Sequence, residues 1–289
     1  MTLAAIESLL GIAEIAFDTG PILGDPFLVS PAHPFIAGAT RAQGTLSHPI
    51  VMSFVILAGV AFACAQRSRP GLRMPLLGLL LVGAFATGSA SATVIAAVIV
   101  ILWILNRRTA PGATFAVLGV GVASLVLIGS GLSGAVLEDE FSATNTAHRM
   151  NSIASTSNLV TLRSVPSAIF GDGFGSVERL YRSGVLVDDG FYALDNQYVA
   201  LLIQGGVAGA VLACCAFVGM TWLIATAPAR RRYFAGWVGI LAMGFAFDYL
   251  AWFATSALFL AYAGVALAAS DDSSRRVAAT STAFPHARL

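Results

Sequence analysis

The sequence predicts an all-α fold, a polytopic transmembrane helix bundle of about seven spans with a large extracytoplasmic loop. Composition is the first reason, since 57% of the 289 residues are hydrophobic and only 11% are charged, whereas soluble domains carry about a quarter charged residues. The second reason is that long apolar segments alternate with short polar connections. The third is the placement of the arginines, which supply all 16 basic residues because the chain has no lysine.

The arginines indicate which connections face the cytoplasm, because cytoplasmic loops of membrane proteins are enriched in basic residues. If the apolar segments are successive membrane spans, most of the arginines lie on one side of the membrane. They are Arg67, Arg69, Arg73, Arg107, Arg108, Arg230, Arg231, Arg232, Arg275 and Arg276. The other side retains Arg41, Arg149, Arg163, Arg179 and Arg182. Loop composition is a sufficient explanation for Arg179 and Arg182, whereas the surroundings of Arg41 and Arg149 suggest a function.

Residues 1–48 are expected to form an amphipathic helix and a loop on the outer face. Apolar residues recur at helical spacing from Leu3 to Phe17, but this run is shorter than the roughly 20 residues that a bilayer requires. A helix lying along the membrane surface is therefore predicted. Glu7 and Glu14, together with the lack of a basic start, argue against a signal peptide.

Residues 49–132 are expected to hold the first transmembrane helices. One helix is predicted at about residues 49–66, and the apolar segment 75–105 is long enough for two short helices. The small polar residues at 87–91 mark the turn between those two helices. A further span at about residues 112–132 returns the chain to the outside.

Residues 133–194 form the predicted extracytoplasmic loop, which is rich in acidic residues. In the predicted transmembrane region 195–269, the chain re-enters the membrane near Asp195, pauses at the glycine pair 205–206, and then forms two helices over 233–269. Asp248 is placed at the outer turn between these two helices and is expected to be solvated. Residues 270–289 are expected to form a disordered cytoplasmic tail.

No cofactor, metal or nucleic-acid partner is predicted. The acidic runs at 138–140 and 188–189 have the oxygen ligands that divalent cations prefer, but solvated acidic loops are commoner. Gly171, Gly173 and Gly175 could cradle a phosphate, although a tight turn with positive φ is the favoured interpretation. The cysteines lie in apolar runs and are interpreted as small hydrophobic residues; they are Cys64, Cys214 and Cys215.

Several short motifs, in this order along the chain, resemble those of the bacterial O-antigen ligase and O-antigen polymerase family. They are Arg-Ala-Gln-Gly-Thr-Leu-Ser-His-Pro from Arg41 to Pro49, the small polar turn at 87–91, Arg149 with Pro166 and the glycine turn at 170–175, and Asp195-Asn196-Gln197-Tyr198 followed by the glycines at 205–209. The resemblance covers roughly residues 41–269 and corresponds to the C-terminal part of that fold.

The resemblance implies glycosyl transfer at the outer face of the bacterial cytoplasmic membrane, from a polyprenyl-diphosphate-linked glycan to a hydroxyl of an acceptor glycan or lipid-linked glycan. Arg41 and Arg149 are the candidates for binding the diphosphate, because guanidinium groups stay charged and hold phosphate oxygens bidentately. Asp195 is the candidate catalytic base for the acceptor hydroxyl. His48 and Asn196 are further predicted substrate-binding residues.

Helix geometry separates a further candidate, Arg163, from Arg149. If residues 147–164 form one helix, these arginines share a face but lie about 21 Å apart, at a rise of 1.5 Å per residue. They cannot hold one diphosphate together, so Arg163 is expected to contact either the glycan or an acidic loop residue. His48, which precedes Pro49, has two open interpretations: a substrate ligand, or a residue that bonds the backbone at the start of a helix.

Two departures from the family leave alternatives open. Ligases of the family usually have histidine where this chain has Asp195, which favours the polymerase branch. The family also has further helices before the Arg41 region. Three explanations stay open: a fragment, one half of a split protein in which a second chain supplies the missing helices, or a chain with a mis-set start. Half of a lipid-linked glycan transporter and an inactive membrane scaffold are the competing functions, and the absence of ionisable residues from the predicted span interiors favours an enzyme over a transporter.

Overall fold

The described part of the chain has an all-α fold, as the sequence predicts. The computed structural model describes residues 1–21, 32–66, 70–106, 150–187 and 194–269. Within these ranges the regular secondary structure is helical, and the only extended pairing is an isolated bridge between Ala32 and Thr40. The predicted span at 112–132 and the predicted tail at 270–289 lie outside the described residues.

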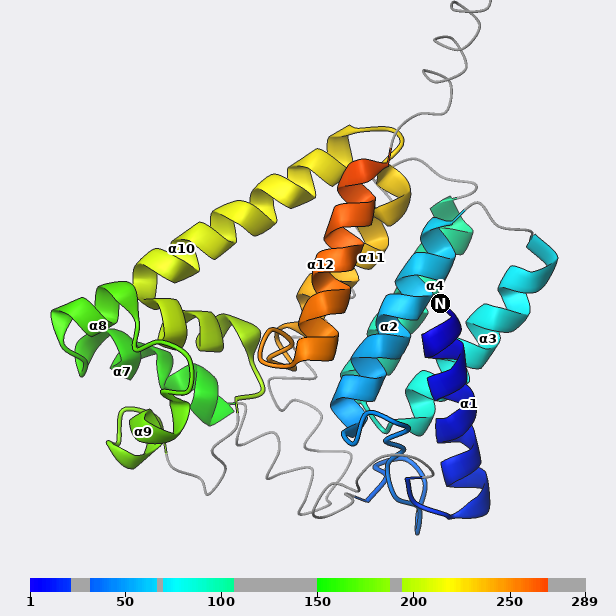
Figure 1. The fold of residues 1–289 in the computed structure, drawn as a ribbon, viewed down its shortest axis with the longest axis horizontal. Coiled ribbons are helices and arrows are strands. Elements are labelled where there is room, and N and C mark those ends of the chain that lie inside the picture. Colours follow the sequence, from blue (N-terminus) through cyan, green and yellow to red (C-terminus); the bar gives the residue numbers. More distant parts are fainter. Residues whose placement is uncertain (22–31, 67–69, 107–149, 188–193, 270–289) are drawn as a thin grey trace, which may run out of the picture.

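The order of helices confirms most of the predicted breaks (Figure 1). The helices are α1 (Thr2–Phe17), α2 (Pro49–Ala65), α3 (Pro70–Ala86), α4 (Ala90–Asn106), α7 (Thr156–Thr161), α8 (Val165–Phe170), α9 (Val177–Arg182), α10 (Gln197–Thr226), the 3₁₀ helix η2 (Arg231–Tyr233), α11 (Phe234–Met243) and α12 (Phe253–Ala268). The breaks between α3 and α4 and between α11 and α12 fall where the sequence predicts them. Helix α3 begins earlier than predicted and contains Pro75.

Helix α2 lies at the centre of the main bundle and is buried along almost its whole length. It contacts α1, α3, α4, α11 and α12. Its sequence is apolar on every face, which is the pattern of a helix enclosed by other helices. Small residues permit close approach, since a Cβ added at Gly59 would lie 2.4 Å from the Ala4 Cβ of α1.

Helix α1 is present where predicted, but its polar face, and not its apolar face, packs against the bundle. It packs along α2 and α3, and the polar residues Glu7 and Glu14 point into the bundle while Leu3, Ile6 and Phe17 are exposed. A helix with polar residues inside and apolar residues outside is suited to contact with lipid on its outer face. The spacing of apolar residues predicts this helix correctly, and its position along the membrane surface stays a prediction.

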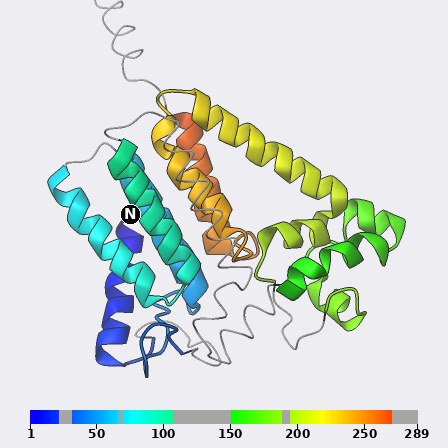
Figure 2. The same cartoon turned by 180° about the vertical axis from the view of Figure 1, so that it is seen from behind.

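One end of the bundle gathers the segments that carry the candidate site. The N-termini of α2, α4 and α12 and the C-termini of α1, α3 and α11 lie at this end, and the start of α10 reaches it as well (Figures 1 and 2). We call it the His48 end; it is marked by His48, Thr87, Asn196 and Trp252.

Helix α10 is long and apolar enough to cross a membrane by its length and composition, and it is the one such helix among the described residues. Only 6% of its most apolar window is buried inside the protein, which distinguishes it from the enclosed core helix of a soluble protein. Shorter apolar helices are found at Pro49–Ala65, Leu72–Ala86, Ala90–Leu105 and Phe253–Ala268. The number of spans therefore stays a prediction.

Part of the predicted extracytoplasmic loop is itself helical. Helices α7, α8 and α9 gather around the first part of α10, on the side of the molecule away from α1 and α3 (Figures 1 and 2). A small apolar core that includes Leu159, Leu180, Tyr181 and Ile203 holds this unit together.

Candidate functional site

The loop that carries Arg41 is held in place by hydrogen bonds to two buried carboxylates of α1. Glu14 accepts hydrogen bonds from the backbone N–H groups of Gln43 (2.8 Å) and Gly44 (3.2 Å). Glu7 accepts from the Thr45 N–H (3.0 Å) and from the Thr45 hydroxyl. A buried carboxylate is stable only when it is paired or hydrogen-bonded, so these contacts explain both the burial of Glu7 and Glu14 and the fixed course of the loop.

Gly44 is required by this arrangement. Its φ is +57°, and a Cβ at this position would lie 2.1 Å from the Glu7 carboxylate. Any larger residue would displace Glu7 and adopt an unfavourable backbone conformation. The glycine of the Arg-Ala-Gln-Gly motif is thus explained by the support of the loop.

Arg41 itself is fastened to the turn between α3 and α4. Its Nε donates to the Thr87 carbonyl at 2.8 Å, and the neighbouring Ala42 N–H donates to the Ala86 carbonyl at 3.1 Å. Gly88 allows this close contact, because a Cβ there would lie 2.9 Å from the Arg41 Cγ. The first and second sequence motifs therefore meet in space through Arg41 and Thr87.

His48 begins α2 and is kept neutral by its surroundings. Its Nδ1 accepts from the Ile50 N–H at 3.2 Å, and its ring lies 5.2 Å from the Trp252 ring. The pKa of His48 is lowered to about 4, chiefly by burial and also by the positive charge of Arg41, while the charge of Asp195 acts in the opposite direction. Because Nδ1 accepts, the neutral ring carries its proton on Nε2. The backbone-bonding interpretation of His48 is confirmed, and its contact with substrate stays a prediction.

Asp195 and Asn196 lie at the start of α10, where the chain meets the turn between α11 and α12. The Asn196 side-chain oxygen caps the helix by accepting from the N–H groups of Tyr198 (3.0 Å) and Val199 (3.2 Å). Gln197 donates its N–H to the Gly244 carbonyl and accepts the Leu250 N–H through its side chain, both at 2.7 Å. Capping accounts for Asn196 in structural terms, and its role toward a substrate stays a prediction.

Asp248 belongs to the same end of the bundle and was not identified as a site residue from the sequence. Its exposed fraction is only 7%, which corrects the expectation of a solvated turn residue. Burial raises the pKa of Asp248 to about 6; backbone N–H groups of Ala251 and Leu250 oppose the shift, and the charge of Asp195 adds to it. No local signal in the sequence identifies it, because its burial depends on the packing of Trp252 against His48 and of Leu250 against Gln197.

The structure thus brings Arg41, His48, Asp195 and Asn196 to one end of the bundle and adds Asp248. The guanidinium group of Arg41 favours an anion at this end. The N-termini of α2, α4, α10 and α12 act in the same direction, and the C-termini of α1, α3 and α11 act against it. Two carboxylates and a neutral imidazole can accept or hold a proton there. Among the described residues, no three His, Cys, Asp or Glu side chains lie close enough together to ligate one metal ion.

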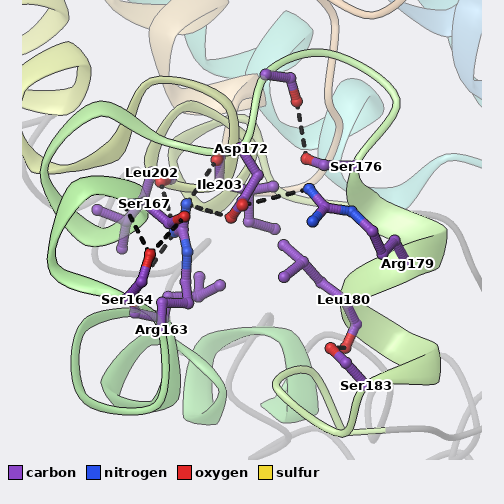
Figure 3. Close-up of polar contacts among 12 residues, drawn as sticks. Arg163, Ser164, Ser167, Asp172, Ser176, Arg179, Leu180, Ser183, Leu202 and Ile203 are labelled. Carbon is purple, nitrogen blue, oxygen red and sulfur yellow. Dashed lines mark hydrogen bonds and ion pairs between the residues drawn. The ribbon is translucent and has the colours of Figure 1, made fainter.

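Arg163 lies away from the His48 end, in the unit formed by α7, α8, α9 and the first part of α10. Its guanidinium pairs with Asp172 at 2.5 Å, and its side chain is only 2% exposed (Figure 3). It also donates to the carbonyls of Leu202 (3.3 Å) and Ile203 (3.2 Å). The expected contact with an acidic loop residue is confirmed, and contact of Arg163 with a glycan stays a prediction.

These contacts stabilise a break in α10. Gly206 has φ 62° and ψ −165°, so the helical ladder is interrupted there. The carbonyls before the break find other donors, because Asp172 N–H binds the Ile203 carbonyl (2.9 Å) and Gly173 N–H binds the Gln204 carbonyl (3.1 Å). The predicted pause at the glycine pair is therefore a fixed kink.

The glycine turn serves this kink. Gly171, Gly173 and Gly175 have φ values of +81°, +79° and +76°, which confirms the turn interpretation. A Cβ at Gly171 would lie 2.2 Å from the Gln204 carbonyl oxygen, so only glycine permits the close approach of the turn to α10.

Some predicted site residues lie outside the described residues. They are Arg149, the second predicted diphosphate ligand, and the acidic runs at 138–140 and 188–189. Their predicted roles are not tested by the structure.

Comparison with known proteins adds no relative to this description. No protein-family model matches the sequence, and searches of curated proteins and of solved structures find no significant match.

Proposed function

We propose that this chain is a multi-pass protein of the bacterial cytoplasmic membrane and transfers a glycan from a polyprenyl diphosphate to a sugar hydroxyl. The His48 end faces the outside, and the reaction takes place there without a cofactor. The lipid bilayer and the two glycan substrates are the partners of this activity. The observation that carries the proposal is the fixed position of Arg41 on Thr87, beside His48 and at the end where several helix N-termini converge.

Each feature of this end supports one requirement of the reaction. The oxygen of the acceptor hydroxyl forms a bond to the anomeric carbon while the bond from that carbon to the diphosphate oxygen breaks. The leaving diphosphate takes the electron pair, and a guanidinium group together with helix N-termini stabilises its negative charge. The proton of the hydroxyl passes to a carboxylate, for which this end offers Asp195 and Asp248.

The competing function of a lipid-linked glycan transporter depends on ionisable groups inside the bundle. Glu7 and Glu14 are such groups, since both are buried in α1. Both, however, accept hydrogen bonds from backbone N–H groups of the Arg41 loop. Groups that hold a loop in place cannot also bind and release a transported ion without releasing that loop, so their geometry favours the enzyme.

Replacement of Arg41 by lysine tests the proposal. A lysine ammonium group cannot bond the Thr87 carbonyl and also hold a diphosphate bidentately. Loss of one charge-assisted hydrogen bond costs about 1.5–3 kcal/mol, so we expect Arg41→Lys to reduce glycan transfer in the source cells by roughly 10- to 100-fold.

The matched control is Arg182→Lys, because Arg182 is an exposed arginine of α9. We expect this variant to keep the wild-type level of surface glycan, measured by gel electrophoresis of extracted glycolipids. Wild-type glycan levels in Arg41→Lys cells, at equal protein abundance, would contradict the assigned role of Arg41.

A further inference from the structure

Asp248 has the features of a residue that meets a ligand. It lies in the turn between α11 and α12, is 7% exposed, and its Oδ1 atom is buried without a hydrogen-bond partner. An unpartnered buried carboxylate oxygen carries a considerable free-energy cost. The Leu250 N–H of the same turn donates to the Gln197 side-chain oxygen at 2.7 Å, so it does not satisfy Oδ1.

The surroundings of Asp248 link it to His48 and to the start of α10, at the same end of the bundle as Arg41. Trp252, from the same turn, contacts the His48 ring at 5.2 Å. Gln197, two residues after Asp195, binds the Leu250 N–H of this turn at 2.7 Å. Hydrogen bonds and ring contacts thus tie the turn to the starts of α2 and α10, independently of any charge effect.

The charged and titratable neighbours of Asp248 are few. Asp195, before α10, adds a like charge, and Tyr249 lies next to Asp248 on the same turn. Beyond Asp195 lies His48, at the start of α2, and the charges of Asp195 and Arg41 both act on it. A carboxylate beside a second carboxylate and away from water is a stronger base than an ordinary one.

We propose that Asp248 is the catalytic residue that accepts the proton of the acceptor hydroxyl through Oδ1, with Asp195 as a positioning residue beside it. This inference rests on the proposed function and changes the sequence-based assignment, in which Asp195 was the base. The hydroxyl proton moves to Oδ1 as the hydroxyl oxygen bonds to the anomeric carbon, and the electron pair of the broken bond leaves with the diphosphate. The proton is later released to water.

A pH series on the purified full chain tests the assignment. The probe is a polyprenyl-diphosphate-linked glycan extracted from the source cells. Since a base must be ionised to act, we expect the wild-type rate to fall as the pH drops below about 6, the pKa of Asp248. We expect Asp248→Asn to lose at least about 100-fold in rate, the usual contribution of a general base.

The variants separate a catalytic role from a structural one. Asp248→Glu keeps a carboxylate, so we expect it to retain a measurable rate. Its rate should still fall at low pH, and we call this part of the pH profile the acidic limb. Asp195→Asn removes the like charge, so the pH below which its rate falls should move to a lower value. Glu178→Gln, an exposed carboxylate-to-amide change on α9, is the matched control and should behave as wild type.

The outcomes are distinguishable. No transfer by the wild-type chain at any pH overturns the proposed function and this inference with it. Transfer by the wild-type chain together with an unchanged rate and acidic limb in Asp248→Asn overturns the inference alone. Loss of the acidic limb in Asp195→Asn, with its retention in Asp248→Asn, returns the base to Asp195.

If Asp248→Asn does not fold, infrared titration of the wild-type, Asp248→Glu and Asp195→Asn proteins provides the test. The inference expects a buried carboxyl group that titrates near pH 6 in the wild-type protein and at lower pH in Asp195→Asn. The same titration curve in both would overturn it.

Discussion

At the scale of single residues, the candidate site depends on groups that do not take part in chemistry. Glu7 and Glu14 hold the backbone of residues 43–45, and the loop in turn presents Arg41 to the Thr87 carbonyl. Gly44 and Gly88 are the positions where a Cβ would break this chain of contacts. The motif around Arg41 therefore has a structural role in addition to its proposed catalytic one.

His48 gives a prediction about the pH dependence of stability. Its pKa is lowered in the folded protein to about 4 from a usual value of 6.5, so the unfolded chain binds the proton more tightly. The contribution of His48 to the free energy of unfolding is fully present above pH 6.5 and is lost as the pH falls from 6.5 to 4.

Thermal unfolding in detergent between pH 4 and 7 measures this contribution. His48→Asn keeps a good helix N-cap but cannot titrate in this range. We expect the stability difference between wild type and His48→Asn to shift in favour of the variant as the pH is lowered. A difference that does not change with pH would contradict the burial of a neutral imidazole.

At the scale of elements, α10 is the most specialised helix. Its break at Gly206 frees the carbonyls of the preceding turn, and Arg163, Asp172 and Gly173 supply the donors that replace the helical ones. In a membrane such carbonyls are costly unless another part of the protein satisfies them. The unit formed by α7, α8 and α9 thereby determines where the start of α10, with Asp195, is placed.

The kink predicts unequal effects of two neighbouring glycine substitutions. A Cβ at Gly206 would lie 2.4 Å from the Ile169 backbone, and its φ is +62°, whereas a Cβ at Gly205 meets nothing within 4 Å. We expect Gly206→Ala to reduce the free energy of unfolding by about 3 kcal/mol or more. Gly205→Ala should stay within about 1 kcal/mol of wild type or raise stability slightly, since alanine favours the helix.

Denaturant unfolding of the two variants in the same detergent measures the difference. Equal stability of Gly206→Ala and Gly205→Ala would mean that α10 runs straight through this position in the protein.

The helix breaks show what local sequence can predict at this scale. Small polar residues at 87–91 and the glycine pair at 205–206 interrupt apolar runs, so the turn and the kink could be located from the sequence. The inward face of α1 could not, because its glutamates pair with residues 43–45, which are distant in sequence. For the same reason Arg163 was recognised as a conspicuous charge, but its partner Asp172 was not specified.

At the scale of the whole molecule, the bundle brings separate motifs to one end. Helix directions alternate, so the starts of α2, α4, α10 and α12 converge at the His48 end (Figure 1). The sequence could predict this convergence because the order of apolar segments fixes which turns share a side. It could not predict the burial of Asp248, which depends on the packing of Trp252 against His48 and of Gln197 against Leu250.

Transfer by the purified chain is the most direct test of the central claim, that the His48 end catalyses glycosyl transfer from a polyprenyl diphosphate. The measurement is the appearance of a lengthened glycan and of free polyprenyl diphosphate in vesicles that contain this chain and the extracted lipid-linked glycan. We predict that both products form in equal amounts at pH 7. If neither product forms with the folded chain, while the same lipid-linked glycan is used by membranes of the source cells, the claim is contradicted.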